Sequence, residues 1–341
     1  MIHMSDGKNI AKRCTVCVVV RDRFSTTFRC LDNLIANTPE PYELVVILGG
    51  APAHVQKALQ EGFGHKARFV FEKKFLNQAE YRNIALRETQ TPLVAIVEND
   101  VYVRPGWLPP LIRCLDETGA GFVVPLVLEA PTIIHTAGND LMITHKNGKS
   151  YGHKVLRYAK IMYYEDSNIQ RARTDYGELH CQLFQAEPAR RLEIFDERLH
   201  EPTEVDSGLM MAKGGYEMWF EPTSVVDFDF PERITKVEDI RVYKFKWDQK
   251  NIVESMAIFE KKWGIDLTAL RTWPVFLTSM NQRLGIWSRI FPSRWAVAVD
   301  EFYYLLKSWF KSPLVLWRKF KDWRVGHYRW QTGRGRAGKR G

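Results

Sequence analysis

The sequence has no uninterrupted apolar stretch of about 18 residues, the length that a transmembrane helix needs. Its polar start, MIHMSDGKNIAKR, lacks the apolar segment of a secretory signal, and no internal repeat is visible. There is also no glycine-rich phosphate loop after the first predicted strand, where the chain reads RDRFSTT, which argues against a nucleotidyltransferase. We therefore expect a soluble or surface-bound cytoplasmic protein.

Cysteine is scarce, and its five residues are an odd number scattered along the chain (Cys14, Cys17, Cys30, Cys114 and Cys181). Most lie in apolar runs such as CTVCVVV, which favours buried thiols in a reducing compartment. Cys14 and Cys17 have the spacing of a redox or metal-binding pair. Because no second pair follows and the stretch is typical of a β-strand, we expect core thiols instead.

The net charge of +9 is carried by one end of the chain. Residues 291–341 contain twelve Lys and Arg against three Asp and Glu, whereas the preceding residues contain equal numbers of both signs. Five of the eleven tryptophans also lie in this basic tail, among apolar residues at helical spacing. The pattern favours an amphipathic helical appendage on an anionic membrane surface, where each basic residue contributes about 1 kcal/mol.

Two other interpretations of this tail remain open. Its aromatic residues could pack on the rest of the chain, or its end, TGRGRAGKRG, could bind nucleic acid. We expect no nucleic-acid partner, because no RNA-binding motif accompanies the basic end.

Short β-branched runs alternate with segments of helical spacing through the first hundred residues. Strands are predicted at 14–20, 43–48, 67–72 and 93–100, and helices between them, at 54–62 and 77–90 among others. This alternation predicts an α/β fold with a parallel, doubly wound sheet, which binds ligands at the carboxyl ends of its strands. We therefore expect three strand ends, Arg21-Asp22-Arg23, Leu48-Gly49-Gly50 and Glu98-Asn99-Asp100, to open onto one edge.

Three groups of polar residues are candidates for chemistry. Glu98 and Asp100 could be solvated turn residues, but they end a strongly apolar strand. The alternation of side chains along a strand puts both on one face, where their carboxylates can reach a divalent cation bound to phosphate. Arg82 lies near the start of a predicted helix, where it could be part of a solvated face or could neutralise a diphosphate. Glu201, Glu204 and Asp206 could cap a helix, or one of them could act as a general base on a hydroxyl.

The order of these segments resembles the family-two glycosyltransferases, inverting enzymes of the GT-A fold with a mostly parallel, Rossmann-like sheet flanked by helices. The matching motifs, over roughly residues 14–264, are VVVRDRF, ELVVIL, NQAEYRNIAL, ENDVYVRPGWL and FDERLHEPTEVDSGLMMAKGGYEMWFEP. Where most relatives carry an acidic D-D-G-S segment after the second strand, this chain has LGGAP. That departure leaves open the choice of nucleobase.

The resemblance implies a site and a mechanism. It assigns the nucleotide-sugar donor, a UDP- or GDP-sugar, to Arg21, Asp22, Gly49, Arg82, Asn83, Glu98 and Asn99. It assigns Mg²⁺ or Mn²⁺ to Asp100, with Glu98 as a further ligand and Asp227 or Asp229 in the place of a histidine of the relatives. The base that deprotonates the acceptor hydroxyl corresponds best to Glu204, with Asp206 as the close alternative.

We therefore expect a catalytic domain at 1–245, a helical extension packed on it at 246–290, and the basic aromatic tail at 291–341. The predicted activity is sugar transfer to a lipid-linked or polysaccharide acceptor at the inner face of the cell membrane, with a homo-oligomer possible. The alternative is a catalytically inactive relative that binds a sugar nucleotide or scaffolds a polysaccharide assembly complex, which the altered LGGAP segment favours.

Overall fold

The computed structural model describes residues 13–39, 42–129, 132–163, 167–229, 234, 236–267 and 283. All belong to the first of the two units into which the chain divides, Met1–Arg283. The elements in order are β1 (Cys14–Val19), α2 (Thr27–Asn37), β2 (Glu43–Gly49), α3 (Ala53–Phe63), β3 (Arg68–Glu72), α4 (Gln78–Glu88), β4 (Leu93–Glu98), β5 (Val101–Val103), α5 (Leu108–Thr118), β6 (Phe122–Glu129), β7 (Ile133–Thr136), β8 (Asn139–Lys146), β9 (Lys149–Leu156), β10 (Ala172–Thr174), β11 (Cys181–Gln185), α6 (Ala186–Arg191), α7 (Thr203–Lys213), β12 (Met218–Phe228), α8 (Val237–Lys246), α9 (Gln249–Trp263) and β13 (Ile265–Asp266). The predicted tail at 291–341 lies outside the described residues, and the predicted domain boundaries stay predictions.

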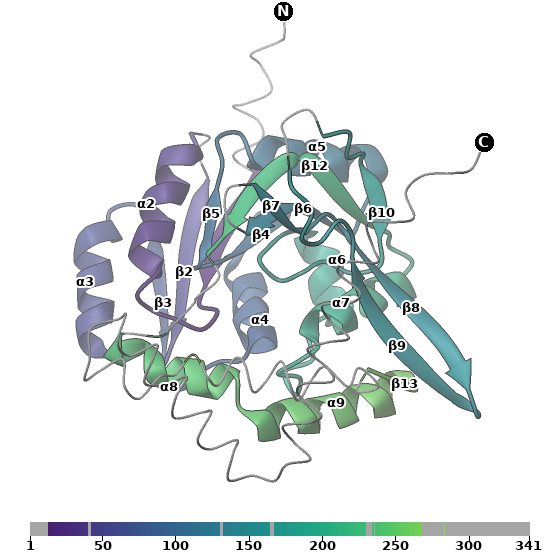
Figure 1. The fold of residues 1–341 in the computed structure, drawn as a ribbon. Coiled ribbons are helices and arrows are strands. Elements are labelled where there is room, and N and C mark those ends of the chain that lie inside the picture. Colours follow the sequence, from purple (N-terminus) through teal and green to yellow (C-terminus); the bar gives the residue numbers. More distant parts are fainter. Residues whose placement is uncertain are drawn as a thin grey trace, which may run out of the picture. The chain divides into compact units, whose positions relative to one another are not determined.

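The main sheet has the strand order β10-β12-β6-β11-β4-β1-β2-β3 (Figure 1). Strands β3, β2, β1 and β4 are mutually parallel, β12 is parallel to β6, and β11 runs antiparallel between β4 and β6. The predicted α/β fold with a mostly parallel sheet is confirmed. Its central strands are apolar along their whole length because both faces are covered, as in other parallel sheets.

The strand register brings the predicted ligand edge together. Val19 pairs with Glu98 at the ends of β1 and β4, so the segments that follow both strands leave the sheet at the same place. Helix α4 begins at Asn77 with a capping box, in which Asn77 and Glu80 each accept the other's backbone N–H. It packs on β1, β2 and β4, which carries Arg82 under the same edge.

Residues 132–187, to which the sequence assigns little, supply β7, β10 and β11 to the main sheet and the β8–β9 hairpin to a smaller one. The β8–β9 hairpin extends away from the main sheet and joins β13 in a three-stranded sheet (Figure 1). Most of β8 is exposed, so its sequence lacks the apolar alternation that predicts a half-buried strand. All five cysteines are buried and free, as predicted.

Candidate active site

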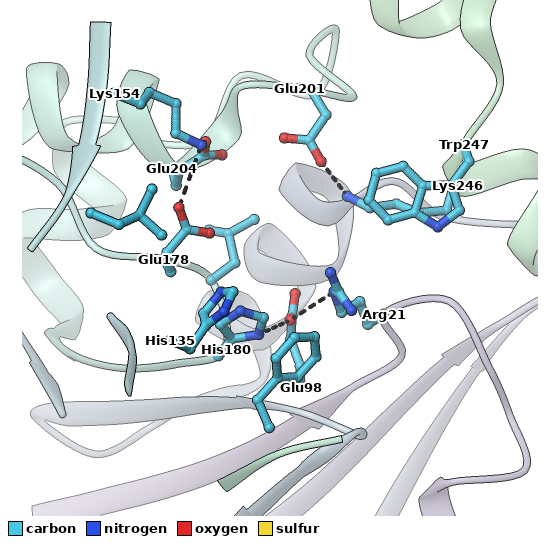
Figure 2. Close-up of a pocket in the computed structure, with 13 residues that line it drawn as sticks. Arg21, Glu98, His135, Lys154, Glu178, His180, Glu201, Glu204, Lys246 and Trp247 are labelled. Carbon is cyan, nitrogen blue, oxygen red and sulfur yellow. Dashed lines mark hydrogen bonds and ion pairs between the residues drawn. The ribbon is translucent and has the colours of Figure 1, made fainter. Parts of the chain in front are cut away.

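A cavity of about 210 Å³ lies at the carboxyl ends of β1 and β4 (Figure 2). Its walls come from segments far apart in sequence, because β7, β9, α7 and the residues after α8 all reach this edge of the sheet. The lining residues are Arg21, Glu98, His135, Lys154, Leu156, Glu178, Leu179, His180, Glu201, Glu204, Phe228, Lys246 and Trp247.

Glu98 is the most heavily contacted acid of the cavity. Its Oε2 lies 3.1 Å from His180 Nδ1 and 3.4 Å from Arg21 Nε, and its Oε1 lies 3.5 Å from Arg82 Nη2. Burial alone would raise the pKa of Glu98, but the hydrogen bond from His180 and the charges of the two arginines lower it to about 2. Glu98 is therefore ionised at neutral pH, and Arg82 is buried beneath it.

Asp100 is buried next to this group but does not line the cavity. Its Oδ2 lies 3.1 Å from Arg21 Nη1 and 3.6 Å from Arg23 Nη2, whereas its Oδ1 has no hydrogen-bond partner among the described residues. Asp22 also contacts both arginines, at 3.7 and 3.3 Å. Arg21, Arg23 and Arg82 thus contact the two acids, Glu98 and Asp100, that the resemblance assigns to a metal.

Asn99 shapes the loop between β1 and α2. Its Oδ1 accepts the backbone N–H of Arg21, and its Nδ2 donates to the carbonyl of Arg23 and the hydroxyl of Thr27. With these bonds the buried amide holds the backbone that presents Arg21 to the cavity.

Glu204, the predicted base, lies in the first turn of helix α7 and points into the cavity (Figure 2). Its carboxylate accepts a hydrogen bond from Lys154 Nζ, which also lies 3.4 Å from Glu178 Oε1. Burial raises the pKa of Glu204 to about 7, although the charge of Lys154 opposes the shift. A carboxylate with this pKa can accept a proton near neutral pH.

Asp206, the alternative base, faces a different part of the protein. Its carboxylate accepts hydrogen bonds from Lys262 Nζ at 2.9 Å and from Trp263 Nε1 at 2.7 Å, both at the end of α9. It does not line the cavity. These hydrogen bonds connect α7 to the end of α9, so the contacts of Asp206 are structural.

Asn83 and Gly49, which the resemblance assigns to the donor, do not line the cavity. Asn83 donates to Phe195 O and Glu197 Oε1 in a separate surface pocket of about 690 Å³. A Cβ on Gly49 would lie 2.6 Å from Leu76 Cγ, so glycine allows the close approach of the loop between β3 and α4.

The two aspartates of β12 and its end also differ from each other. Asp227 binds Arg104 through two hydrogen bonds of 2.8 Å. Asp229 lies nearer the strand end, where its backbone N–H donates to Asp100 O and its Oδ2 lies 3.6 Å from Arg23 Nη1. The roles assigned to these residues stay predictions.

Several lining residues have no counterpart in the sequence prediction, above all His135, Lys154, Glu178 and His180. They lie in the 132–187 region, whose many histidines and acids give no spacing signal. Lys246 Nζ pairs with Glu201 Oε1 at 2.7 Å on the opposite wall. Three basic side chains and four carboxyl groups line the cavity, so with Glu204 ionised and the histidines neutral the lining carries a net charge of −1.

The comparisons with known proteins agree with this architecture. The sequence model of glycosyl transferase family 2 matches residues 15–186, which is half of the chain. Among solved structures, the fold is similar to the crystal structure of GalNAc-T7 with UDP, GalNAc and Mn²⁺, with a TM-score of 0.52 at 15% identity. The match covers 82% of this chain and 56% of that chain. No curated protein matches the chain.

Proposed function

Because the chain belongs to glycosyl transferase family 2 and is a glycosyltransferase, we propose that it transfers a sugar from a UDP- or GDP-sugar to an acceptor hydroxyl with inversion at the anomeric carbon. The observation that carries the proposal is Glu204, a buried carboxylate that faces the cavity beside the strand ends. Its pKa of about 7 suits a general base at neutral pH. In a single displacement, Glu204 takes the proton of the acceptor hydroxyl as the oxygen attacks the anomeric carbon.

The donor's diphosphate is the part of the substrate that the basic side chains suit. Arg21, Lys154 and Lys246 line the cavity, and Phe228 and Trp247 offer aromatic surface beside Arg21. Each of the three cations is already paired with a carboxylate. A lining with a net charge of −1 favours a diphosphate that arrives together with a cation, as UDP and Mn²⁺ are both found in the structure of GalNAc-T7.

We therefore include Mg²⁺ or Mn²⁺ in the proposal. The predicted ligands Glu98 and Asp100 form, with His180, a group whose ligand atoms all lie within 4.8 Å of one another, and the unpaired Asp100 Oδ1 suits an ion. When bound, the ion would neutralise charge on the departing nucleoside diphosphate. Arg21, Arg23 and Arg82 already contact these two acids, so Asp100 and Glu98 as ligands stay a prediction.

The acceptor and the place of action are the part of the proposal that the sequence alone supports. We propose a lipid-linked or polysaccharide acceptor at the inner face of the cell membrane, reached through the basic, tryptophan-rich residues 291–341. None of the described helices combines the length and apolar character needed to cross a bilayer. Deletion of residues 302–341 should abolish co-sedimentation with anionic liposomes, and unchanged binding would refute this part.

The test of the reaction is a panel of UDP- and GDP-sugars, screened for Mn²⁺-dependent binding and slow hydrolysis by the full chain. The Glu204→Gln variant should lose on the order of 10²-fold or more in turnover while it still binds the donor, because the amide cannot accept the proton. Near-normal turnover would move the role of base to Asp206 or elsewhere. If no sugar nucleotide binds, the proposal fails.

A further inference from the structure

A second group of possible metal ligands faces the cavity directly. His135 lies on β7, and Glu178 and His180 precede β11, so the pairing of β7 and β11 with β6 brings the three together. All three line the cavity, and their ligand atoms lie within 4.8 Å of one another. In Figure 2 the two imidazoles lie next to each other, between Glu178 and Glu98.

Each of the two imidazoles is oriented by a carboxylate behind it. His135 Nδ1 lies 2.9 Å from Glu129 Oε2, and His180 Nδ1 lies 3.1 Å from Glu98 Oε2. These bonds fix the rings and leave Nε2 of each as the nitrogen for another partner. Histidines that bind metals are almost always held in this way, with the second nitrogen bonded to a carboxylate or carbonyl. Both imidazoles therefore share this feature with the histidines of metal sites.

The spacing suits one ion. Bonds of about 2.0–2.2 Å to nitrogen and oxygen place two ligand atoms at most about 4.4 Å apart on opposite sides of an ion. The ligand atoms of this group lie within 4.8 Å of one another, so the three side chains are close enough to share one ion once they move toward it. Because the cavity lies on the open side, phosphate oxygens or water can supply the remaining ligands.

The surrounding charges also favour this group over the strand-end acids. Three guanidinium groups contact Glu98 and Asp100, and Asp100 does not reach the cavity. Glu178 has a basic partner, Lys154, at 3.4 Å. If an ion replaces Lys154 as the partner of Glu178, Lys154 still pairs with Glu204. The net charge of −1 on the lining adds attraction for a cation.

We propose that His135, Glu178 and His180, in place of the predicted ligands Glu98 and Asp100, bind the divalent ion, with Mn²⁺ preferred to Mg²⁺, and that Glu129 and Glu98 orient the two imidazoles. The preference follows from the donor set, because imidazole nitrogens suit transition ions and Mg²⁺ prefers oxygen ligands and water. The role of the ion in binding a sugar-nucleotide diphosphate rests on the proposed function, whereas the binding of the ion to the protein does not. Glu98 then acts through His180 as a positioning residue.

The experiment measures binding of Mn²⁺ alone to the full chain by electron paramagnetic resonance of the free ion, with Mg²⁺ as competitor. His135→Asn and Glu178→Gln should each weaken binding at least 10-fold, and Glu129→Gln about 10- to 100-fold through the loosened ring. His145→Asn at the hairpin tip and Glu187→Gln on the exposed side of α6 are matched controls that should bind as the natural chain does.

Three results would overturn the site: no binding of Mn²⁺ by the natural chain, equal affinity for Mg²⁺, or normal binding by His135→Asn and Glu178→Gln with loss in Asp100→Asn. The melting temperature of each variant identifies one that fails to fold, and the other ligand variant then decides the result. A chain that binds Mn²⁺ here but neither binds nor hydrolyses any sugar nucleotide refutes the proposed function and leaves the site intact.

Discussion

Replacement of Lys154 by methionine should shift the pH dependence of catalysis, because this lysine is the cation paired with the proposed base. Glu204 is buried, so its ionised form depends on Lys154, while Glu178, Glu201 and Arg82 supply the other nearby charges. A hydrogen bond to a charged group contributes about 1.5–3 kcal/mol. Since each 1.4 kcal/mol is a factor of ten, its loss lowers the ionised fraction at neutral pH about 10- to 100-fold.

The sign follows from the proton equilibrium of Glu204. Its pKa of about 7 predicts that the rate of the natural chain rises with pH through about 7, as the carboxyl group loses its proton. Without Lys154 the pKa of Glu204 rises further, so the rise in rate moves to higher pH. At pH 7 the variant should be about 10- to 100-fold slower, and it should recover in alkaline buffer.

The assay is kcat/KM for donor and acceptor between pH 5.5 and 9.5. Lys154→Arg keeps the charge and should keep the profile near its natural position, and Lys149→Met, an exposed residue on the same strand, should leave it unchanged. A Lys154→Met profile that is lowered equally at every pH would refute the reasoning. Such a result would mean that Lys154 contacts the substrate and does not tune the base.

Three further substitutions test the assignments around the cavity. Asp206→Asn should lower the free energy of unfolding, measured in urea, by about 1–3 kcal/mol, because it weakens the contacts with α9. If the variant instead keeps its stability and loses about 10²-fold in turnover, Asp206 is the base. Arg82→Leu should cost about 3–5 kcal/mol in the same measurement, since it removes a charge partner of the buried Glu98. Gly49→Ala should lower the melting temperature because its Cβ meets Leu76, and an unchanged value would show that the loop yields.

The sheet and its ligand edge could be predicted because the signals there are local. Strands β1, β2 and β4 are buried on both faces, so their sequences are continuous apolar runs. Such runs predict a parallel sheet from the sequence alone. The acids that end β4 then mark the edge at which a ligand binds. The pattern of acids at the start of a helix draws attention to Glu201, Glu204 and Asp206, and the family resemblance then selects Glu204 among them.

The remainder of the cavity could not be predicted, because its residues are united only by tertiary structure. Lys154 comes from a hairpin whose neighbouring strand is largely exposed and has no apolar alternation, and its partner Glu204 is fifty residues away. His135 and His180 are adjacent only because β7 and β11 both pair with β6. No spacing rule in the sequence connects such residues.

The pairing of charges in the cavity changes what can be expected of Arg21, which the family resemblance assigns to the nucleotide-sugar donor. Arg21 contacts both Glu98 and Asp100, and its guanidinium group lies over the aromatic rings of Phe228 and Trp247. Its charge is therefore already balanced before a donor enters, and a diphosphate must either displace these acids or bring a cation of its own. Displacement would take one basic partner from each of two buried carboxylates and leave, among the described residues, only Arg82 and His180 on Glu98 and Arg23 on Asp100, which is the more costly course. Donor affinity should accordingly depend far more steeply on the divalent ion than on Arg21.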